Sequence, residues 1–279
     1  MHRYMVYDVF TTARFGGNQL AVFPDATGIA EEDLQAIAAE FNFSETTFVY
    51  PPENEENTAR VRIFTPTTEI RFAGHPVIGT AAALADMGCG PDMTLELGVG
   101  PLECLASSGS ASFVTEVPLE IIGKPDPELV ARALGLSEDD IVTTTHVPTL
   151  ASLGLPFTIT ELKDRETLAS IRTSHHAFLE GAKQFPGGVD FAQFAYVRDG
   201  ETVHARMFAP LDNIPEDPAT GSACATLAAL LSLIEGTPID LTVHQGEDMG
   251  RPSLIDVQTS GAAVTVTGHS VRVMEGRLL

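Results

Sequence analysis

Two helix-like segments of this sequence are apolar on every side, and they constrain the fold more than any other feature. Residues 76–84 and 219–234 contain only Ala, Gly, Val, Ile, Leu, Thr, Ser, Cys and one Pro, and the first charges after them are Asp86 and Glu235. A helix that is apolar all round must be enclosed by protein, and its small residues let strands approach closely. We therefore expect each helix at the centre of a curled sheet.

The rest of the chain is rich in short strand-like runs. They are punctuated by turn residues such as Gly16-Gly17-Asn18 and Asp199-Gly200, which favours antiparallel strands over βαβ repeats. Helical patterns fall at 31–40, 76–87, 127–134 and 220–235. The predicted fold is α+β, with two similar lobes, each an antiparallel β-barrel-like sheet wrapped around a central apolar helix.

A short internal repeat supports two lobes. Phe64-Thr-Pro66 precedes Gly79 by 79 − 64 = 15 residues, and Phe208-Ala-Pro210 precedes Gly221 by 221 − 208 = 13. Each copy predicts a strand, a proline turn, a polar loop and an enclosed helix. The stretch 118–127 is the expected linker, so the predicted lobes are 1–120, to which about 267–279 return, and 121–266.

Charge excludes two classes of partner. The 279 residues include 16 Lys and Arg against 38 Asp and Glu, a net charge of −22. Nucleic acid and anionic membranes would be repelled, so neither is an expected partner. At 44% hydrophobic residues the chain can bury a large core.

Nothing in the sequence points to secretion, a membrane span or a metal centre. The first ten residues lack a signal-peptide pattern, and the apolar run 223–234 is shorter than the roughly 20 residues of a membrane span. The cysteines Cys89, Cys104 and Cys224 are odd in number and lack ligand spacing. The adjacent His175 and His176 are interpreted as an exposed loop pair. We expect a soluble cytoplasmic protein without a metal.

The helix starts are candidate anion sites, because the first amides of a helix have no intrahelical acceptor. The first start carries Gly74 and His75. The second follows Asp217-Pro218, an expected cap and first turn, and its candidate binding residues are Thr220, Gly221 and Ser222. Simpler roles remain open: Asp217 as an N-cap, His75 as a partner of a buried carbonyl, and the hydroxyls as ordinary first-turn groups.

Glu45 is the candidate proton-transfer residue. If the segment 41–49 is extended, Glu45 shares a face with Phe41, Phe43 and Val49. Desolvation there would raise the pKa of the carboxyl, which could then remove and return a proton near neutrality. In the alternative, residues 44 and 45 form a turn and Glu45 lies in water.

Several segments together resemble the phenazine-biosynthesis-like (PhzF-like) isomerase family, from the first strand to the C-terminus. The 216–223 segment is the most specific of them. They are, in chain order, FGGNQLAV at 15–22, NFSET at 42–46, TPTTEIRFAGHP at 65–76, EDPATGSA at 216–223 and QGEDMGRPS at 245–253.

The resemblance implies a diaminopimelate-epimerase-like fold with the active site in the cleft between the lobes, a homodimer and no cofactor. It implies that Glu45 shuttles a proton on a dihydroaromatic substrate and that His75 and Asp217 are active-site residues. It places the substrate carboxylate at Gly221 and Ser222, and Gly74 at the opposing helix start. Val77 departs from the Thr expected after Gly-His-Pro, which bears on substrate identity.

Other enzyme classes fit less well. A two-thiol epimerase needs a cysteine at each helix start, but Cys89 follows the first helix and Cys224 has no counterpart at Gly74-His75. A serine hydrolase would need a G-x-S-x-G elbow, which is missing. The predicted function is a cofactor-independent acid–base isomerase of a small carboxylate-bearing, cyclic or dihydroaromatic amino-acid-like substrate, with Glu45 as the general acid and base. The alternative is a non-catalytic binding or scaffold protein that keeps the cleft.

Overall fold

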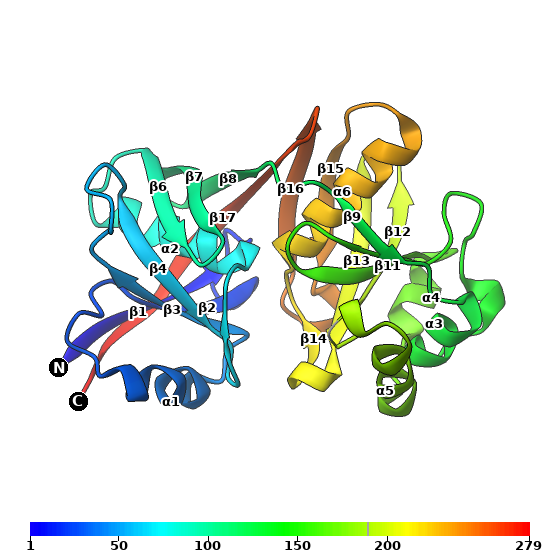
Figure 1. The fold of residues 1–279 in the computed structure, drawn as a ribbon, viewed down its shortest axis with the longest axis horizontal. Coiled ribbons are helices and arrows are strands. Elements are labelled where there is room, and N and C mark those ends of the chain that lie inside the picture. The colour runs from blue at the N-terminus through cyan, green and yellow to red at the C-terminus, as the bar shows by residue number, and fades with distance from the viewer. Residues whose placement is uncertain (189) are drawn as a thin grey trace. The chain divides into compact units, whose positions relative to one another are not determined.

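The computed structural model describes residues 1–188 and 190–279, and the chain divides into two compact units. Unit 1 comprises Met1–Thr115, Ser253–Ile255 and Thr265–Leu279, and unit 2 comprises Glu116–Pro252 and Asp256–Val264 (Figure 1). The C-terminal segment therefore belongs to the same unit as the N-terminus. Each unit is described by itself.

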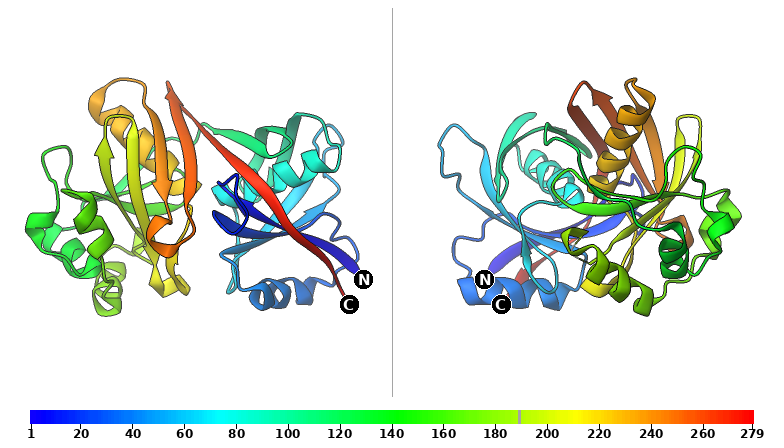
Figure 2. Two further views of the ribbon diagram at one scale, coloured as in Figure 1. Left: turned by 180° about the vertical axis from the view of Figure 1, so that it is seen from behind. Right: turned by 45° about the vertical axis from the view of Figure 1, so that its right-hand side comes forward.

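Unit 1 is a closed barrel. Hydrogen bonds join its strands in the order β1, β2, β3, β4, β6, β7, β8, β17 and back to β1. The long strand β17 runs antiparallel along β1, as the view from behind shows (Figure 2). The ring consists of β1 (His2–Val9), β2 (Asn18–Phe23), β3 (Glu45–Tyr50), β4 (Ala59–Phe64), β6 (Asp92–Leu97), β7 (Gly100–Ser107), β8 (Ser110–Thr115) and β17 (Ala263–Leu278).

Helix α2 (Gly74–Asp86) fills this barrel, as its composition predicts. Every residue from Gly74 to Leu84 is buried, and the helix contacts β1, β2, β3, β7 and β8. Gly79 makes the close approach possible, because a Cβ there would lie 2.5 Å from Leu20 Cδ2 and 2.7 Å from Val9 Cγ2. The enclosed position of the first apolar helix is confirmed.

Helix α1 (Glu31–Phe41) packs on the barrel through its one apolar stripe. Leu34, Ile37 and Ala38 are buried against Phe23 and Phe48. Its acidic first turn, Glu31 to Asp33, complements the positive end of the helix dipole. The helix therefore needs burial on one side only, unlike α2.

Unit 2 repeats the pairing order of unit 1 around its own apolar helix. The remaining strands are β5 (Glu69–Ile70), β9 (Glu120–Gly123), β10 (Thr149–Ser152), β11 (Pro156–Glu161), β12 (Gln193–Asp199), β13 (Thr202–Ala209), β14 (Ile214–Asp217), β15 (Asp240–Gln245) and β16 (Ser253–Ser260). In unit 2 the pairs β10–β11, β12–β13 and β13–β14 are antiparallel, and they correspond to β1–β2, β3–β4 and β4–β5 of unit 1. The pairs β11–β12 and β13–β15 are parallel, and they correspond to β2–β3 and β4–β6.

Helix α6 (Gly221–Glu235) lies against β10, β11 and β15, and its residues from Gly221 to Ala228 are all buried. The predicted enclosure is confirmed for this first part of α6 but is wrong for its last turn, where Leu233 and Ile234 are 65% and 42% exposed. The antiparallel pairing predicted from the turn residues holds for most strand pairs but not for all of them, because the described part of each unit also contains two parallel pairs. Helices α1, α2 and α6 lie in the crossovers of three of these four parallel pairs, and the fourth, between β11 and β12, is connected through residues 162–192.

A second core in unit 2 was not predicted in full. Helices α3 (Pro127–Leu134), α4 (Arg165–Ser170) and α5 (His175–Gln184) bury residues such as Leu129, Leu168 and Phe178 together. The His175-His176 pair is exposed as expected, but it begins α5 instead of lying in a loop. The predicted linker at 118–127 is also partly wrong, since it contains β9, which pairs with β10.

Among the residues that the structure describes, no helix is both long and apolar enough to cross a membrane.

Candidate active-site residues

Glu45 and His75 meet in unit 1, where the starts of three elements come together. Glu45 is the first residue of β3, His75 is the second residue of α2, and Asn18 is the first residue of β2. The pairing of Leu20 with Glu45 in parallel register brings the beginnings of β2 and β3 to the same end of the barrel. The carboxylate Oε2 of Glu45 lies 2.9 Å from His75 Nδ1.

The other contacts of His75 restrict where its proton can be. Nε2 lies 3.3 Å from the carbonyl oxygen of Gln19, and a carbonyl can only accept, so Nε2 carries hydrogen. In the neutral ring Nδ1 is then the acceptor, which suits the Asn18 amide nitrogen 3.4 Å away. The short approach of Glu45 to Nδ1 requires a proton on one of these two groups.

Burial gives this contact its chemical interest. The side chains of His75 and Glu45 are only 4% and 12% exposed, so both groups are largely removed from water. Glu45 Oε2 makes no well-directed hydrogen bond with any described residue despite its distance from Nδ1. A buried carboxylate oxygen without such a bond is costly, and a substrate hydrogen would satisfy it.

The local structure around Glu45 differs from the extended segment considered from the sequence. Helix α1 continues to Phe41 and ends at Asn42, whose φ of 52° lies in the left-handed region. Phe41 instead packs edge-on against Tyr4 and Phe23. The prediction that Glu45 shares a strand face with Phe41 and Phe43 is therefore wrong. The burial of Glu45 is confirmed, and the exposed-turn alternative is wrong.

The start of α6 in unit 2 is organised by a glutamine that the sequence reasoning did not assign. Gln245 is 0% exposed. Its Nε2 donates to the Asp217 carbonyl at 2.8 Å and lies 3.0 Å from Thr220 Oγ1, while its Oε1 accepts from the Thr220 amide at 3.1 Å. The same Thr220 hydroxyl donates to Asp217 Oδ2 at 2.6 Å. One side chain thus ties the end of β15 to the residues that precede α6.

Asp217 is not the helix cap that its position before Pro218 predicted. It ends β14, and the N-cap residue of α6 is Thr220, which makes no side-chain cap bond. Asp217 is 5% exposed, and its carboxylate accepts the hydrogen bond that orients the Thr220 hydroxyl. The amides of Gly221 and Ser222 follow in the first turn, where an anion is electrostatically favoured.

Cys224 also lies near the start of α6, but the surroundings of its thiol make it unreactive. It is fully buried, and burial together with the nearby Asp217 charge raises the pKa of its thiol. A protonated thiol is a poor base. This environment agrees with the exclusion of a two-thiol epimerase.

The structure therefore groups the predicted residues within each unit. Glu45, His75 and Gly74 lie at the start of α2, and Asp217, Thr220, Gly221 and Ser222 lie at the start of α6. Sequence reasoning missed Asn18, Gln19 and Gln245 as individual contributors. All three fall inside the segments 15–22 and 245–253 quoted for the family resemblance, which was the available signal.

A large cavity of unit 1 does not coincide with these residues. It has a volume of about 830 Å³ and is lined by residues of β4, β5, β6 and β7. Two of its arginines are already paired, Arg60 with Glu53 and Arg62 with Glu69. The candidate site therefore consists of the contacts of Glu45 and His75 and of the start of α6, and none of these residues lines the cavity.

Comparison with known proteins identifies relatives across the whole chain. The family described as phenazine biosynthesis-like protein matches residues 7–276. An uncharacterized isomerase of Mesorhizobium japonicum is 38% identical, covering 99% of this chain and 98% of that protein. The trans-2,3-dihydro-3-hydroxyanthranilate isomerase of Pseudomonas aeruginosa is 33% identical, covering 99% of both chains.

A solved structure agrees at the level of the fold. The Bacillus anthracis phenazine biosynthesis protein of the PhzF family superposes with a TM-score of 0.87 at 24% identity, covering 100% of this chain and 99% of that one. The resemblance inferred from the short segments is confirmed. The chain therefore belongs to the phenazine biosynthesis-like (PhzF) family, and it is an isomerase.

Proposed function

We propose that this protein moves a proton within a small carboxylate-bearing, cyclic or dihydroaromatic amino-acid-like substrate, without a cofactor, and that Glu45 is the general acid and base. The observation that carries the proposal is the buried Glu45 carboxyl 2.9 Å from His75 Nδ1, with its Oε2 lacking a well-directed hydrogen bond among the described residues. The 33% identical relative named for a dihydro-hydroxyanthranilate supports the substrate class.

In the proposed reaction Glu45 acts as a carboxylate that removes a proton from an activated substrate carbon. The electrons of that C–H bond form a new double bond, and the existing double bond shifts along the allylic system. Glu45, now a carboxylic acid whose proton can exchange with solvent, delivers one proton to the far carbon, so the substrate gains and loses one proton in balance. A positioned acid and base of this kind contributes typically 10²–10⁴-fold to a rate.

His75 would hold the Glu45 carboxyl group in one orientation and share a proton with it through the contact at Nδ1. Its Nε2 faces the Gln19 carbonyl, so its ring is held with Nδ1 toward the carboxyl group. While Glu45 is a carboxylate, the proton that this short contact requires lies on Nδ1, which donates it to the carboxylate as a hydrogen bond. Asn18, 3.4 Å from Nδ1, helps to hold the imidazole in place.

We assign binding of the substrate carboxylate to the start of α6. The amides of Gly221 and Ser222 provide donors and the positive end of the helix dipole, and Thr220 adds a hydroxyl. Asp217 would orient a substrate amino or hydroxyl group. This local attraction operates over a few ångströms, whereas the net charge of −22 is screened by salt over about 10 Å.

The recurrence of the strand pairing order in the two units supports two similar lobes around central helices, with a boundary near residue 120. We also propose that the protein is a homodimer and lies in the cytoplasm. Light scattering after gel filtration measures the mass directly, and a monomer of 29.7 kDa would contradict the dimer.

The decisive experiment compares Glu45→Gln with Glu40→Gln, a matched change at an exposed position at the end of α1. Deuterium exchange into trans-2,3-dihydro-3-hydroxyanthranilate and related dihydroaromatic amino acids is followed by NMR in D₂O. We expect Glu45→Gln to lose exchange at least about 100-fold, because the general base is gone. Its ligand affinity by calorimetry should stay near that of the wild type.

The same measurements separate the isomerase from a binding protein or scaffold. Exchange that is equal in the wild type and in Glu45→Gln would contradict the role of Glu45. Binding of the amino acids by the wild type without any exchange would favour the scaffold. Loss of exchange in Glu40→Gln would show that the effect does not belong to residue 45.

A further inference from the structure

Two histidines face each other on neighbouring strands of unit 2, outside the residues discussed above. His204 of β13 and His244 of β15 are directly opposite in the parallel register. Their rings stack with centroids 5.0 Å apart and an interplanar angle of 28°. Both side chains are partly buried, whereas their neighbours Val203, Ala205, Val243 and Gln245 are buried.

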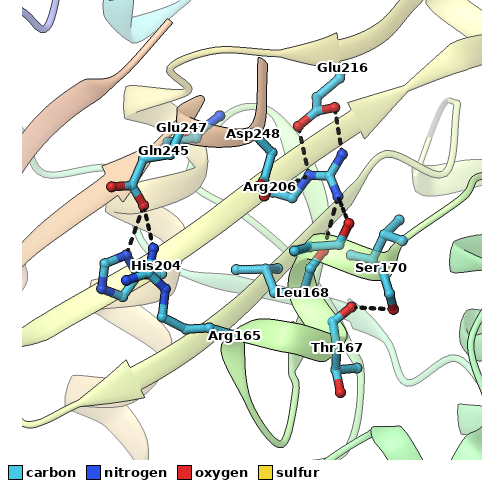
Figure 3. A network of polar contacts seen from close by, with 12 residues as sticks. Arg165, Thr167, Leu168, Ser170, His204, Arg206, Glu216, Gln245, Glu247 and Asp248 are labelled. Atoms are coloured by element: carbon cyan, nitrogen blue, oxygen red, sulfur yellow. Dashed lines mark hydrogen bonds and ion pairs between the residues drawn. The ribbon is translucent and has the colours of Figure 1, made fainter. Parts of the chain in front are cut away.

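A carboxylate completes this pair. Glu247 begins the short 3₁₀ turn Glu247–Met249 that follows β15, and its Oε2 lies 3.1 Å from His204 Nδ1 (Figure 3). One nitrogen from each histidine and one carboxylate oxygen all lie within 4.8 Å of one another. These atoms could share one central ion with small side-chain adjustments, because metal–ligand bonds of about 2.0–2.2 Å place ligands roughly 3–4 Å apart.

A cavity beside these atoms provides room for an ion. It has a volume of about 50 Å³, and His204, His244, Glu247 and Asp248 contribute to its lining. A water needs roughly 10–15 Å³ of such volume, so an ion and a water ligand fit. The cavity is therefore a second observation that points to a bound ligand and not only to an ion pair.

We infer that His204, His244 and Glu247 form a binding site for a divalent first-row transition metal ion such as Zn²⁺. Two imidazoles and a carboxylate with an open position are a typical ligand set for such ions. Alkaline-earth ions, which prefer all-oxygen ligands, would bind poorly at this site.

Arg165 is the competitor of the metal. Its Nη2 lies 2.8 Å from the same Glu247 Oε2 that approaches His204, as the dashed lines in Figure 3 show. The neighbouring Arg206 is already occupied by both oxygens of Glu216. Binding of the metal therefore requires Arg165 to release Glu247 or move to its other oxygen, and removal of Arg165 should tighten binding.

The site lies on the opposite face of the β13–β15 pair from the start of α6. Successive side chains of a strand point to opposite faces, so His244 points away from Gln245, which ties Asp217 to Thr220. The metal would join β13, β15 and the Glu247 turn and so support Gln245 indirectly. This inference does not depend on the proposed isomerase reaction.

The test measures binding of Zn²⁺ and Co²⁺ to the metal-free full chain by calorimetry and visible spectroscopy. We expect one ion per chain, and Co²⁺ bands that Zn²⁺ abolishes. His204→Ala, His244→Ala and Glu247→Gln should each weaken binding at least about tenfold, the effect known for groups that only support a ligand. Arg165→Ala should bind more tightly than the wild type, and His176→Ala, an exposed histidine on α5, should bind like it.

The outcomes are distinguishable even if a histidine variant fails to fold. No saturable binding by the wild type at millimolar metal would overturn the site, as would unchanged binding in folded His204→Ala. Loss of binding in His176→Ala would place the metal at the His175-His176 pair. Weaker binding in Arg165→Ala, with circular dichroism unchanged, would contradict the proposed competition.

Discussion

At the scale of single residues, unit 2 contains a buried acid that the proposed chemistry does not use. Burial, followed by the nearby Asp212 charge, raises the pKa of Asp190 from 3.8 to about 7. Its carboxyl Oδ1 accepts a hydrogen bond from the Ala192 amide at 3.1 Å. Because the folded protein holds this proton more tightly than the unfolded chain, folding is favoured at low pH and that advantage is lost as pH rises.

We predict that Asp190→Asn flattens the pH dependence of stability between about pH 4 and 7. In the wild type the free energy of unfolding should fall across this window by up to about 4 kcal/mol, since one pKa unit is about 1.4 kcal/mol. Asparagine keeps an acceptor for Ala192 but cannot ionise. Urea unfolding at several pH values measures the slope, and Asp199→Asn, an exposed control, should leave it unchanged. A slope that survives in Asp190→Asn would contradict the assignment.

Gln245 is the second residue whose effect can be measured. Its removal leaves the buried Asp217 carbonyl and Thr220 amide without this partner, each such loss costing about 1–3 kcal/mol. Gln245→Ala should therefore lower the free energy of unfolding by at least about 1 kcal/mol and weaken binding of carboxylate ligands.

The control for this change is Gln258→Ala, since Gln258 is exposed and bonds only to Asp240 among the described side chains. Its effect should stay within about 0.5 kcal/mol. Denaturant unfolding of both variants measures the free energy of unfolding, and calorimetry measures their affinity for carboxylate ligands. Equal effects at the two positions would show that the ties from Gln245 do not organise the start of α6.

At the scale of elements, the enclosed helix α2 depends on close packing and not on amphipathicity. Its contacts with several strands of the barrel leave no room for side chains larger than those present at the closest approach. Helix α1, in contrast, buries only Leu34, Ile37 and Ala38. The same substitution should therefore have different consequences in the two environments.

We predict that Gly79→Ala destabilises the protein by about 1–2 kcal/mol. The new methyl group would overlap Leu20 and Val9, a strain of about 1–3 kcal/mol, while alanine recovers up to about 1 kcal/mol of helix propensity. Gly90→Ala is the control for the added methyl group alone, because Gly90 lies outside the helices and no atom lies within 4 Å of its added Cβ. Thermal and urea unfolding measure both. A neutral or stabilising Gly79→Ala would mean that α2 can shift within the barrel.

At the scale of the whole molecule, the surplus of acidic residues opposes folding. The chain has a net charge of −22, so its excess carboxylates repel one another in any compact state. Surface pairs such as Arg62 with Glu31 and Glu69 offset only part of this repulsion, because exposed pairs contribute roughly 0–1 kcal/mol each.

We predict that salt stabilises this protein. Raising NaCl from about 10 mM to 500 mM shortens the screening length from roughly 30 Å to a few ångströms, which weakens long-range repulsion more than short contacts. The melting temperature at pH 7 should rise by several degrees, and KCl should have the same effect as NaCl. A melting temperature that falls with salt would show that local ion pairs outweigh the net charge.

Local pattern was sufficient for part of the fold and of the site. The absence of charge from 76–84 and 219–234 predicted two enclosed helices, because apolar surface on all sides cannot face water. The burial of Glu45 was also predictable, but the identity of the residues around it was not. Strand β3 begins only at Glu45, and helix α1 before it extends to Phe41.

What the sequence by itself determined about this protein is which segments must be buried and where a helix must begin with free amides. Only the tertiary structure decided which strands lie side by side: the parallel pairs, the return of β17 to β1, the contact of Glu45 with His75 and the register that sets His204 opposite His244. Burial follows from the composition of a few neighbouring residues. Strand partners are chosen by hydrogen bonds and packing between residues far apart in the chain, which no local pattern records.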